Sequence, residues 1–202
     1  GMDAVSSPEK LEVALRAMRR LPLPSRAWRA EIEPWRVLFS SDREDRVTRV
    51  SVGAAVFVLT LALRAQGCAA RYELLPRPGL LAVVRFSGRR PPLQGDRRLA
   101  AALDHLDGRR TLTDATRRML ERAAAVEGVR LRFVDDHRAT QAVLSTRRDD
   151  AFAQLVTGLA LGRVMVTAAS LGIRVRWSGD VTPGTPAVLA FDQAATEQRV
   201  SP

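Results

Sequence analysis

The sequence predicts a single α+β domain in which one helix–strand–strand unit occurs twice. Three observations lead to this prediction. Segments with helical and strand periodicity alternate along the chain, two long apolar segments are each followed by a glycine and a pair of strand-like segments, and these two regions align without a gap. A chain of 202 residues is long enough for one core and short for two full domains. We therefore expect one domain over 1–202, with loose ends at 1–8 and 192–202.

The first half of this domain, about residues 9–92, opens with an amphipathic helix at 9–21. A loop that contains Pro22 and Pro24 follows it. The next predicted elements are a strand at 35–39, an apolar helix at 46–66, and strands at 69–75 and 80–86. Gly67 is expected to end the apolar helix. A stretch rich in proline, glycine and arginine then leads to the second half.

The second half, about residues 97–191, repeats this order. Its predicted elements are helices at 97–106 and 113–127, strands at 129–135 and 141–146, a long apolar helix at 149–171, and strands at 173–178 and 187–191. Gly172 is expected to end the long helix, and Pro183-Gly184 to turn the chain between the last two strands.

The two halves align when one is shifted by 105 residues. Over 34 positions that begin at Gly53 and Gly158, the alignment gives nine identities, where residue usage alone would give roughly three. The same shift pairs Gly67 with Gly172. We interpret this as an internal duplication, although any unit of helix, glycine, strand, turn and strand shares part of the pattern. Two such units can pack their apolar helices together, and we expect Gly53 and Gly158 to allow close packing rather than to bind a ligand.

The net charge of +10 comes almost wholly from arginine, since Lys10 is the only lysine. A basic protein can bind phosphates or polyanions. Here the arginines are spread along the chain and often stand next to acids, as at 42–46. This spread indicates general solvation rather than a nucleic-acid interface, and only 89–98 and 109–118 hint at clusters.

Two features favour a cytoplasmic protein without a membrane span. Cys68 is the only cysteine, so no internal disulfide can form and a reducing compartment fits. The longest apolar run, 50–63, falls short of the roughly 20 residues that cross a bilayer. No secretory signal is recognisable either.

Several common catalytic sites have no counterpart in the sequence. Neither a Gly-rich phosphate loop nor a Gly-x-Ser-x-Gly motif occurs. His105, His137 and Cys68 do not have the spacing of zinc ligands, and His137 fits a solvated turn. A hydrolase or a metalloenzyme is therefore not indicated, and we expect no metal site.

What remains is an ordered set of short motifs. In chain order they are Pro24-Ser25, Pro34-Trp35-Arg36, the apolar helix at 46–66, Arg109-Arg110-Thr111, and the segment 143–150 that enters the second apolar helix. The set resembles the FMN-dependent nitroreductases, and in particular the subfamily in which two nitroreductase-like halves in one chain mimic the usual dimer. The resemblance covers about residues 10–191 and lies in order and spacing more than in any single motif.

The resemblance implies a nitroreductase-like α+β sandwich, with the strands in a central sheet and the two repeat helices at its centre. It also implies bound FMN. In that family an Arg-Arg-Thr/Ser segment at a helix start meets the phosphate, because guanidinium groups match phosphate oxygens, and a Pro-Ser…Pro-Trp segment wraps the flavin. The residues of this chain that match are Pro24, Ser25, Pro34, Trp35, Arg109, Arg110 and Thr111.

The chain departs from the family pattern at three points. The loop between Ser25 and Pro34 is longer than in the family and lacks its Asn and Gln. Leu112 and Thr113 stand where an arginine is expected. A long central segment is also absent after His137. The scaffold is therefore kept while the flavin contacts are partly lost.

Simpler roles for several of these residues stay open. The segment 109–111 could be a solvated helix start, with Thr111 or Thr113 as its cap. Trp35 could belong to the core. Trp28 could replace a lost flavin contact or cover the core.

The first functional hypothesis is an FMN-dependent oxidoreductase that transfers electrons from NAD(P)H to a small acceptor, such as a nitroaromatic or a quinone. The cofactor then carries the chemistry, so no catalytic side chain is required. The second is a degenerate member of the fold that binds flavin without turnover, or binds none. The third is an arginine-rich polyanion or nucleic-acid binder. We expect either a monomer that mimics a dimer or a homodimer.

Overall fold

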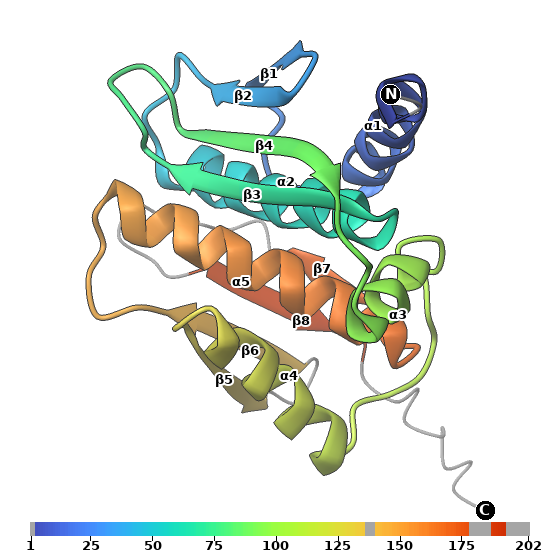
Figure 1. The fold of residues 1–202 in the computed structure, drawn as a ribbon. Helices are drawn as coiled ribbons and strands as arrows, with labels where there is room; N and C mark the ends of the chain where they lie inside the picture. Colours follow the sequence, from blue (N-terminus) through green and yellow to red (C-terminus); the bar gives the residue numbers. More distant parts are fainter. Residues whose placement is uncertain (1–2, 136–139, 178–186, 193–202) are drawn as a thin grey trace, which may run out of the picture.

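The computed structural model describes residues 3–135, 140–177 and 187–192 (Figure 1). Its helices are α1 (Asp3–Arg20), α2 (Arg46–Ala65), α3 (Gln94–Ala102), α4 (Asp114–Val126) and α5 (Ala151–Ser170). Its strands are β1 (Arg29–Glu33), β2 (Arg36–Ser40), β3 (Cys68–Leu74), β4 (Ala82–Arg89), β5 (Arg130–Asp135), β6 (Thr140–Ser145), β7 (Val175–Trp177) and β8 (Ala187–Phe191). The fold is a mixed arrangement of helices and sheets, as the sequence predicts.

The described strands form two four-stranded antiparallel sheets, one in each half. The first sheet has the order β1-β2-β4-β3 and the second the order β5-β6-β8-β7. The expectation of one central sheet is therefore wrong for this part of the chain. The physical reason is visible in Figure 1: the apolar helices α2 and α5 lie side by side between the sheets and separate them.

The two halves place equivalent elements in equivalent positions. Asp45 caps α2 by accepting a hydrogen bond from the N–H of Thr48 at 2.8 Å, and Asp150, 105 residues later, caps α5 in the same way. The hydrogen bonding to Thr48 holds the pKa of Asp45 below its ordinary value. Gly67 and Gly172 follow the ends of these helices with φ of +83° and +74°, a conformation that glycine adopts without strain.

Helices α2 and α5 make the most extensive contact between any two elements, and two glycines lie where they cross. A Cβ atom on Gly53 would lie 2.7 Å from the Cα atom of Gly158, and the reverse distance is the same. The carbonyl oxygens of Leu155 and Val50, also 105 residues apart, would be closer still. The crossing is thus nearly symmetric, and the prediction that these glycines allow close helix packing is confirmed.

The crossing helices are also long and apolar enough to span a membrane by composition alone. In the fold, 83% of the apolar window of α2 and 67% of that of α5 are buried inside the protein. The remaining helices surround this pair: α1 packs on α2, α4 packs on α5, and α3 contacts both. The two helices are therefore the centre of the core.

Strand β1 is the element that the sequence analysis does not predict. It lies within the proline-containing loop and pairs with β2 through a two-residue turn at Pro34 and Trp35, with Glu33 opposite Arg36. Helix α1 also begins earlier than predicted. The segments that hold His137 and Pro183-Gly184 lie outside the described residues.

Candidate functional site

The seven residues that the resemblance marks as flavin contacts lie in three separate places. Pro24 and Ser25 follow α1, Pro34 and Trp35 form the turn between β1 and β2, and residues 109–111 lie between α3 and α4. Of the pockets described below, one is lined by a residue of these groups, Pro24.

Ser25 attaches the loop after α1 to the beginning of α2. Its N–H donates to the Oγ of Ser51 at 3.0 Å, and its hydroxyl oxygen lies 3.4 Å from that of Thr48. The ring N–H of Trp28 donates to the carbonyl oxygen of Ser25 at 2.9 Å, and the Trp28 ring centroid lies 5.7 Å from that of Phe39. Ser25 thus has a structural role, and Trp28 covers the core.

Trp35 lies at the surface of the first sheet. Its side chain is 48% exposed, and its ring centroid lies 6.5 Å from that of the buried Phe86. The N–H of Phe86 donates to the carbonyl oxygen of Trp35 at 3.0 Å. Pro34, beside it in the turn, is exposed. The interpretation of Trp35 as a core residue is therefore wrong, because its ring covers the core from outside.

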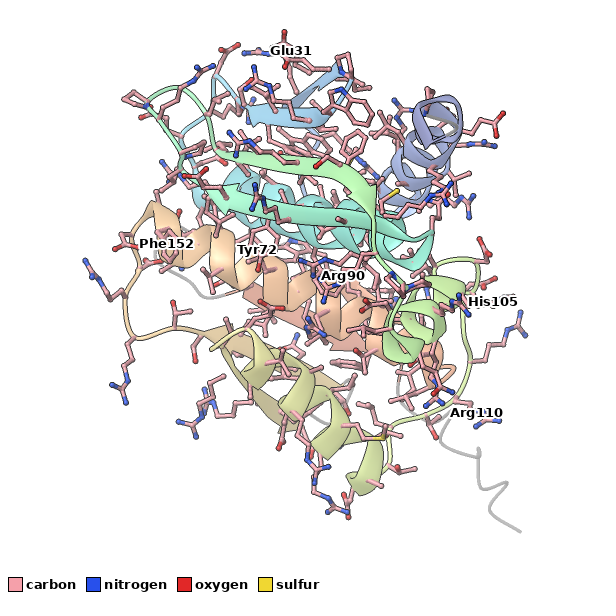
Figure 2. The ribbon with its side chains drawn as sticks, viewed as in Figure 1. Glu31, Tyr72, Arg90, His105, Arg110 and Phe152 are labelled. Atoms are coloured by element: carbon pink, nitrogen blue, oxygen red, sulfur yellow. The ribbon has the colours of Figure 1, made fainter. Side chains whose placement is uncertain are left out.

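The segment 109–111 does not open a helix, so this part of the prediction is wrong. Helix α4 begins after Thr113, which forms a capping box with Thr116: each backbone N–H of the pair donates to the other residue's hydroxyl oxygen, at 3.1 and 2.8 Å. The N–H of Arg110 donates to the carbonyl oxygen of Gly172 at 2.8 Å. The segment therefore ties the connection before α4 to the end of α5, with the Arg110 side chain exposed (Figure 2).

A large groove lies between the end of α1, the segment after α3 and the edge strand β7. We call it the α1–β7 groove. Its lining residues are Arg20, Pro22, Leu23, Pro24, Leu103, Asp104, Leu106, Asp107, Arg174, Val175, Arg176 and Trp177. Its volume is about 660 Å³, within the roughly 300–1,000 Å³ that is typical of small-molecule and cofactor sites.

The α1–β7 groove combines apolar walls with a charged rim of three arginines and two aspartates. Prolines and leucines form most of its apolar lining, and the half-buried Trp177 lies on the β7 side. Arg20 forms an ion pair with Asp104 at 2.6 Å. Arg176 forms an ion pair with Asp192, directly after β8, at 2.7 Å. Arg174 is exposed and has no ion-pair partner in the described part of the chain. Such a site can take a planar ring against tryptophan and a phosphate against arginine.

Two of the three predicted groups are close to this groove in different ways. Pro24 lines it. Residues 109–111 come shortly after Asp107, which lines the groove. Arg110 is hydrogen-bonded to Gly172, two residues before the lining residue Arg174. The other three predicted residues, Ser25, Pro34 and Trp35, do not line it.

No sequence prediction assigns a role to Trp177 or to Arg174. The signal that could have found them is the short run Arg-Val-Arg-Trp at 174–177, which places a tryptophan and two arginines on one short strand and the residue before it. Their distance in sequence from 20–24 and 103–107 conceals the groove, because only the packing of the two halves brings these three segments together.

A smaller pocket, of about 180 Å³, lies where α2 and α5 begin. Arg46 forms an ion pair with Asp149 here, and Arg49 donates from Nη1 to the Oε1 of Gln154 at 2.9 Å. Arg49 and Gln154 occupy equivalent positions in the two halves, 105 residues apart. This pocket is below the volume of a typical cofactor site, and its polar groups join one half to the other.

A third cavity, of about 50 Å³, lies between the halves. Thr60, Tyr72, Glu127 and Arg163 line it, and Arg163 donates to Glu127 at 2.9 Å. Burial raises the pKa of the Tyr72 phenol, and the negative charge of Glu127 raises it further. The phenol is therefore protonated at neutral pH and available as a hydrogen-bond donor.

The Thr60 hydroxyl in this cavity is buried and has no hydrogen-bond partner in the described structure. The substitution Thr60→Val keeps the side-chain shape and removes this group. We expect it to raise the free energy of unfolding by about 1 kcal/mol, because an unsatisfied buried hydroxyl is costly. Urea denaturation followed by circular dichroism measures the change.

The matched control is Thr157→Val, since the buried Thr157 hydroxyl donates to the carbonyl oxygen of Ala153 at 2.9 Å. This control is expected to lower the free energy of unfolding by about 0.5–1.5 kcal/mol. If Thr60→Val were as destabilising as the control, the Thr60 hydroxyl would have a partner, such as a buried water, and the expectation would be wrong.

Comparisons with known proteins give a likeness in structure but none in sequence. The sequence matches no protein-family model and no curated protein. Among solved structures, the chain is similar to a protein of Thermotoga maritima described as a "putative nitroreductase", at 11% identity and a TM-score of 0.41, covering 81% of this chain and 74% of that one. This likeness concerns the path of the chain and carries no argument for a cofactor or a reaction.

Proposed function

We propose that this chain is an FMN-dependent, nitroreductase-like oxidoreductase and that the α1–β7 groove holds the flavin. Its electron donor would be NAD(P)H and its acceptor a small nitroaromatic or quinone. The observation that supports the proposal is the groove itself, which joins apolar walls, one tryptophan and three arginines in a volume of about 660 Å³. A cytoplasmic location, where the buried thiol of Cys68 stays reduced, belongs to the same proposal.

The residues of the groove fit FMN in kind. Trp177 would pack against the flavin ring, and the prolines and leucines would exclude water from it. Arg174 would bind the phosphate by charge-assisted hydrogen bonds, with Arg20 or Arg176 beside it. Bound FMN would supply the hydride-transfer chemistry, so the chain needs no acid, base or nucleophile of its own.

The second candidate is a protein of this architecture that binds flavin without turnover, or binds none. The observation that favours it is the dispersal of the predicted contacts, since Pro24 is the one predicted residue that lines the groove. NAD(P)H separates the candidates: an oxidoreductase loses its flavin absorbance when the donor is added without oxygen, and a flavin binder without turnover keeps it.

We also infer that the two halves arose by duplication of one unit. Equivalent caps, glycines and strand orders recur at the 105-residue spacing. Such a unit buries its apolar helix only when a second copy packs against it.

The experiment that tests FMN binding is a visible absorption spectrum of the protein after FMN is added and the excess removed by gel filtration. Titration of tryptophan fluorescence with FMN then gives the Kd. We expect Arg174→Ala to raise this Kd about tenfold or more, because a charge-assisted hydrogen bond contributes about 1.5–3 kcal/mol. Trp177→Ala is expected to abolish retention of the flavin.

The matched control is Arg71→Ala, because Arg71 is an exposed arginine on β3, the strand of the first half that corresponds to β7. It should leave the Kd unchanged. A double substitution of Arg109 and Arg110 by alanine tests the location: loss of FMN there, with no effect at Arg174, would place the phosphate outside the groove. A colourless protein that retains no FMN would exclude the oxidoreductase.

A further inference from the structure

Each sheet ends in an open edge strand at the outside of the molecule. β1 is the edge of the first sheet and β5 the edge of the second, and Figure 1 shows them at opposite ends of the molecule. β1 precedes and pairs with β2, and β5 precedes and pairs with β6 in the same way. β1 and β5 are therefore equivalent strands of the two halves. An open edge presents unpaired backbone N–H and C=O groups to any further strand.

The two edge strands carry opposite charges on equivalent faces. The face of β1 that points away from the helices carries Glu31 and Glu33 together with Arg29, which is already paired with Asp42, and the same face of β5 carries Arg130, Arg132 and the uncharged Val134. Figure 2 shows Glu31 at the outer limit of the molecule, directed away from it. Glu33 is paired with Arg36 within its own hairpin. The edges are thus alike in fold and complementary in charge.

The β5 edge also has room for another strand. A groove of about 650 Å³ runs between α4 and β5. Its lining includes Ala125, Leu131 and Phe133, with Arg117 5.1 Å from the centre of the Phe133 ring. On β1, Ile32 is 48% exposed and lies on the face that would turn toward this groove.

We propose that β1 of one copy of this chain pairs with β5 of a second copy and joins their sheets into one. An antiparallel register places Glu31 opposite Arg132 and Glu33 opposite Arg130, while the intervening Ile32 lies opposite Leu131. Every charged pair in this register is then of opposite sign, which stabilises cross-strand neighbours. Pairing of β5 with another β5 would instead bring arginines together.

The contact joins unlike surfaces at opposite ends of the molecule. Such a head-to-tail contact leaves one free β1 and one free β5 on every open assembly. Further copies can therefore add beyond a dimer, unless the assembly closes into a ring. The assembly is therefore expected to grow with protein concentration and to weaken with salt, since its charges are exposed. The inference is independent of flavin binding.

Sedimentation equilibrium of the full chain over a range of concentrations tests the proposal. Glu31→Arg and Arg132→Glu should each weaken the association constant about tenfold or more, because each places like charges opposite one another. An equimolar mixture of the two variants should restore the association. The arginine at position 31 of one variant then lies opposite the glutamate at position 132 of the other, and the charges are again of opposite sign. This rescue distinguishes the β1–β5 contact from a general charge effect.

The matched controls are Glu12→Arg on α1 and Arg97→Glu on α3, which make the same charge changes at exposed positions outside both sheets. Both should associate like the unchanged protein, and circular dichroism verifies that every variant is folded. A protein that stays monomeric at high concentration and low salt would overturn the proposal. So would association that the single variants leave intact or that the mixture fails to restore.

Discussion

Gly53→Ala is expected to lower the free energy of unfolding by about 3 kcal/mol. The added Cβ atom would lie 2.7 Å from the Cα atom of Gly158 and closer still to the carbonyl oxygen of Leu155. Both are backbone atoms, so no side-chain rotation can relieve the overlap. Helices α2 and α5 would have to separate, and the packing along the most extensive contact in the protein would loosen.

Urea denaturation of both the variant and the unchanged protein measures this effect. Gly158→Ala should behave in the same way, because its environment is nearly symmetric with that of Gly53. Gly95→Ala is the matched control: Gly95 lies in α3, and a Cβ atom there meets nothing within 4 Å. In a helix this change is expected to be neutral or stabilising by up to about 1 kcal/mol. Similar results for Gly53 and Gly95 would contradict the argument.

Phe39→Ala is expected to lower the free energy of unfolding by about 3–5 kcal/mol. Phe39 is fully buried on the inner face of the first sheet, where Trp28 covers it with ring centroids 5.7 Å apart. Truncation of the Phe39 side chain leaves a cavity, and Trp28 and the other residues around it can fill this cavity only in part. The shift of the urea or thermal unfolding midpoint measures the loss.

The control for this prediction is Phe152→Ala, the same change at a side chain that is 53% exposed near the start of α5 (Figure 2). Its effect should stay within about 0.5 kcal/mol. A Phe39 variant as stable as the Phe152 variant would show that Phe39 does not pack as described. It would also leave the role of Trp28 as a cover of the core without support.

Much of the fold can be predicted because its strongest elements are local in origin. The two apolar helices are long apolar segments, and the glycines after them adopt the positive φ that ends such helices. The shift of 105 residues also identifies positions that prove structurally equivalent, such as Gly53 and Gly158. These features depend on short segments, so the sequence carries them plainly.

The pairing of the strands into one sheet in each half cannot be predicted in the same way. Periodicity shows which residues face inward, but it does not decide which strands are neighbours. β1 escapes prediction because its sequence, Arg-Ala-Glu-Ile-Glu, offers only two apolar residues and follows a proline-containing loop. Its strand conformation depends on pairing with β2, which is a tertiary effect.

The candidate site is the part that the sequence predicts least well, for the same reason. Pro24 lines the α1–β7 groove, whereas the sequence does not single out Trp177 and Arg174. The Arg-Arg-Thr motif suggests a helix start, but Thr113, two residues later, forms the capping box and takes that role. The helix predicted at 113–127 therefore agrees with α4, and Thr113 is its cap, whereas the assignment of 109–111 to the helix start fails.

The hydrogen bond between Arg49 and Gln154 shows what a covalent link between two similar halves makes possible. In an assembly of two identical chains, a residue near the symmetry axis meets its own copy, so an arginine there would face an arginine. Within one chain the two positions can differ. One can become a cation and the other a neutral acceptor, and the interface between the halves gains a contact that exact symmetry forbids.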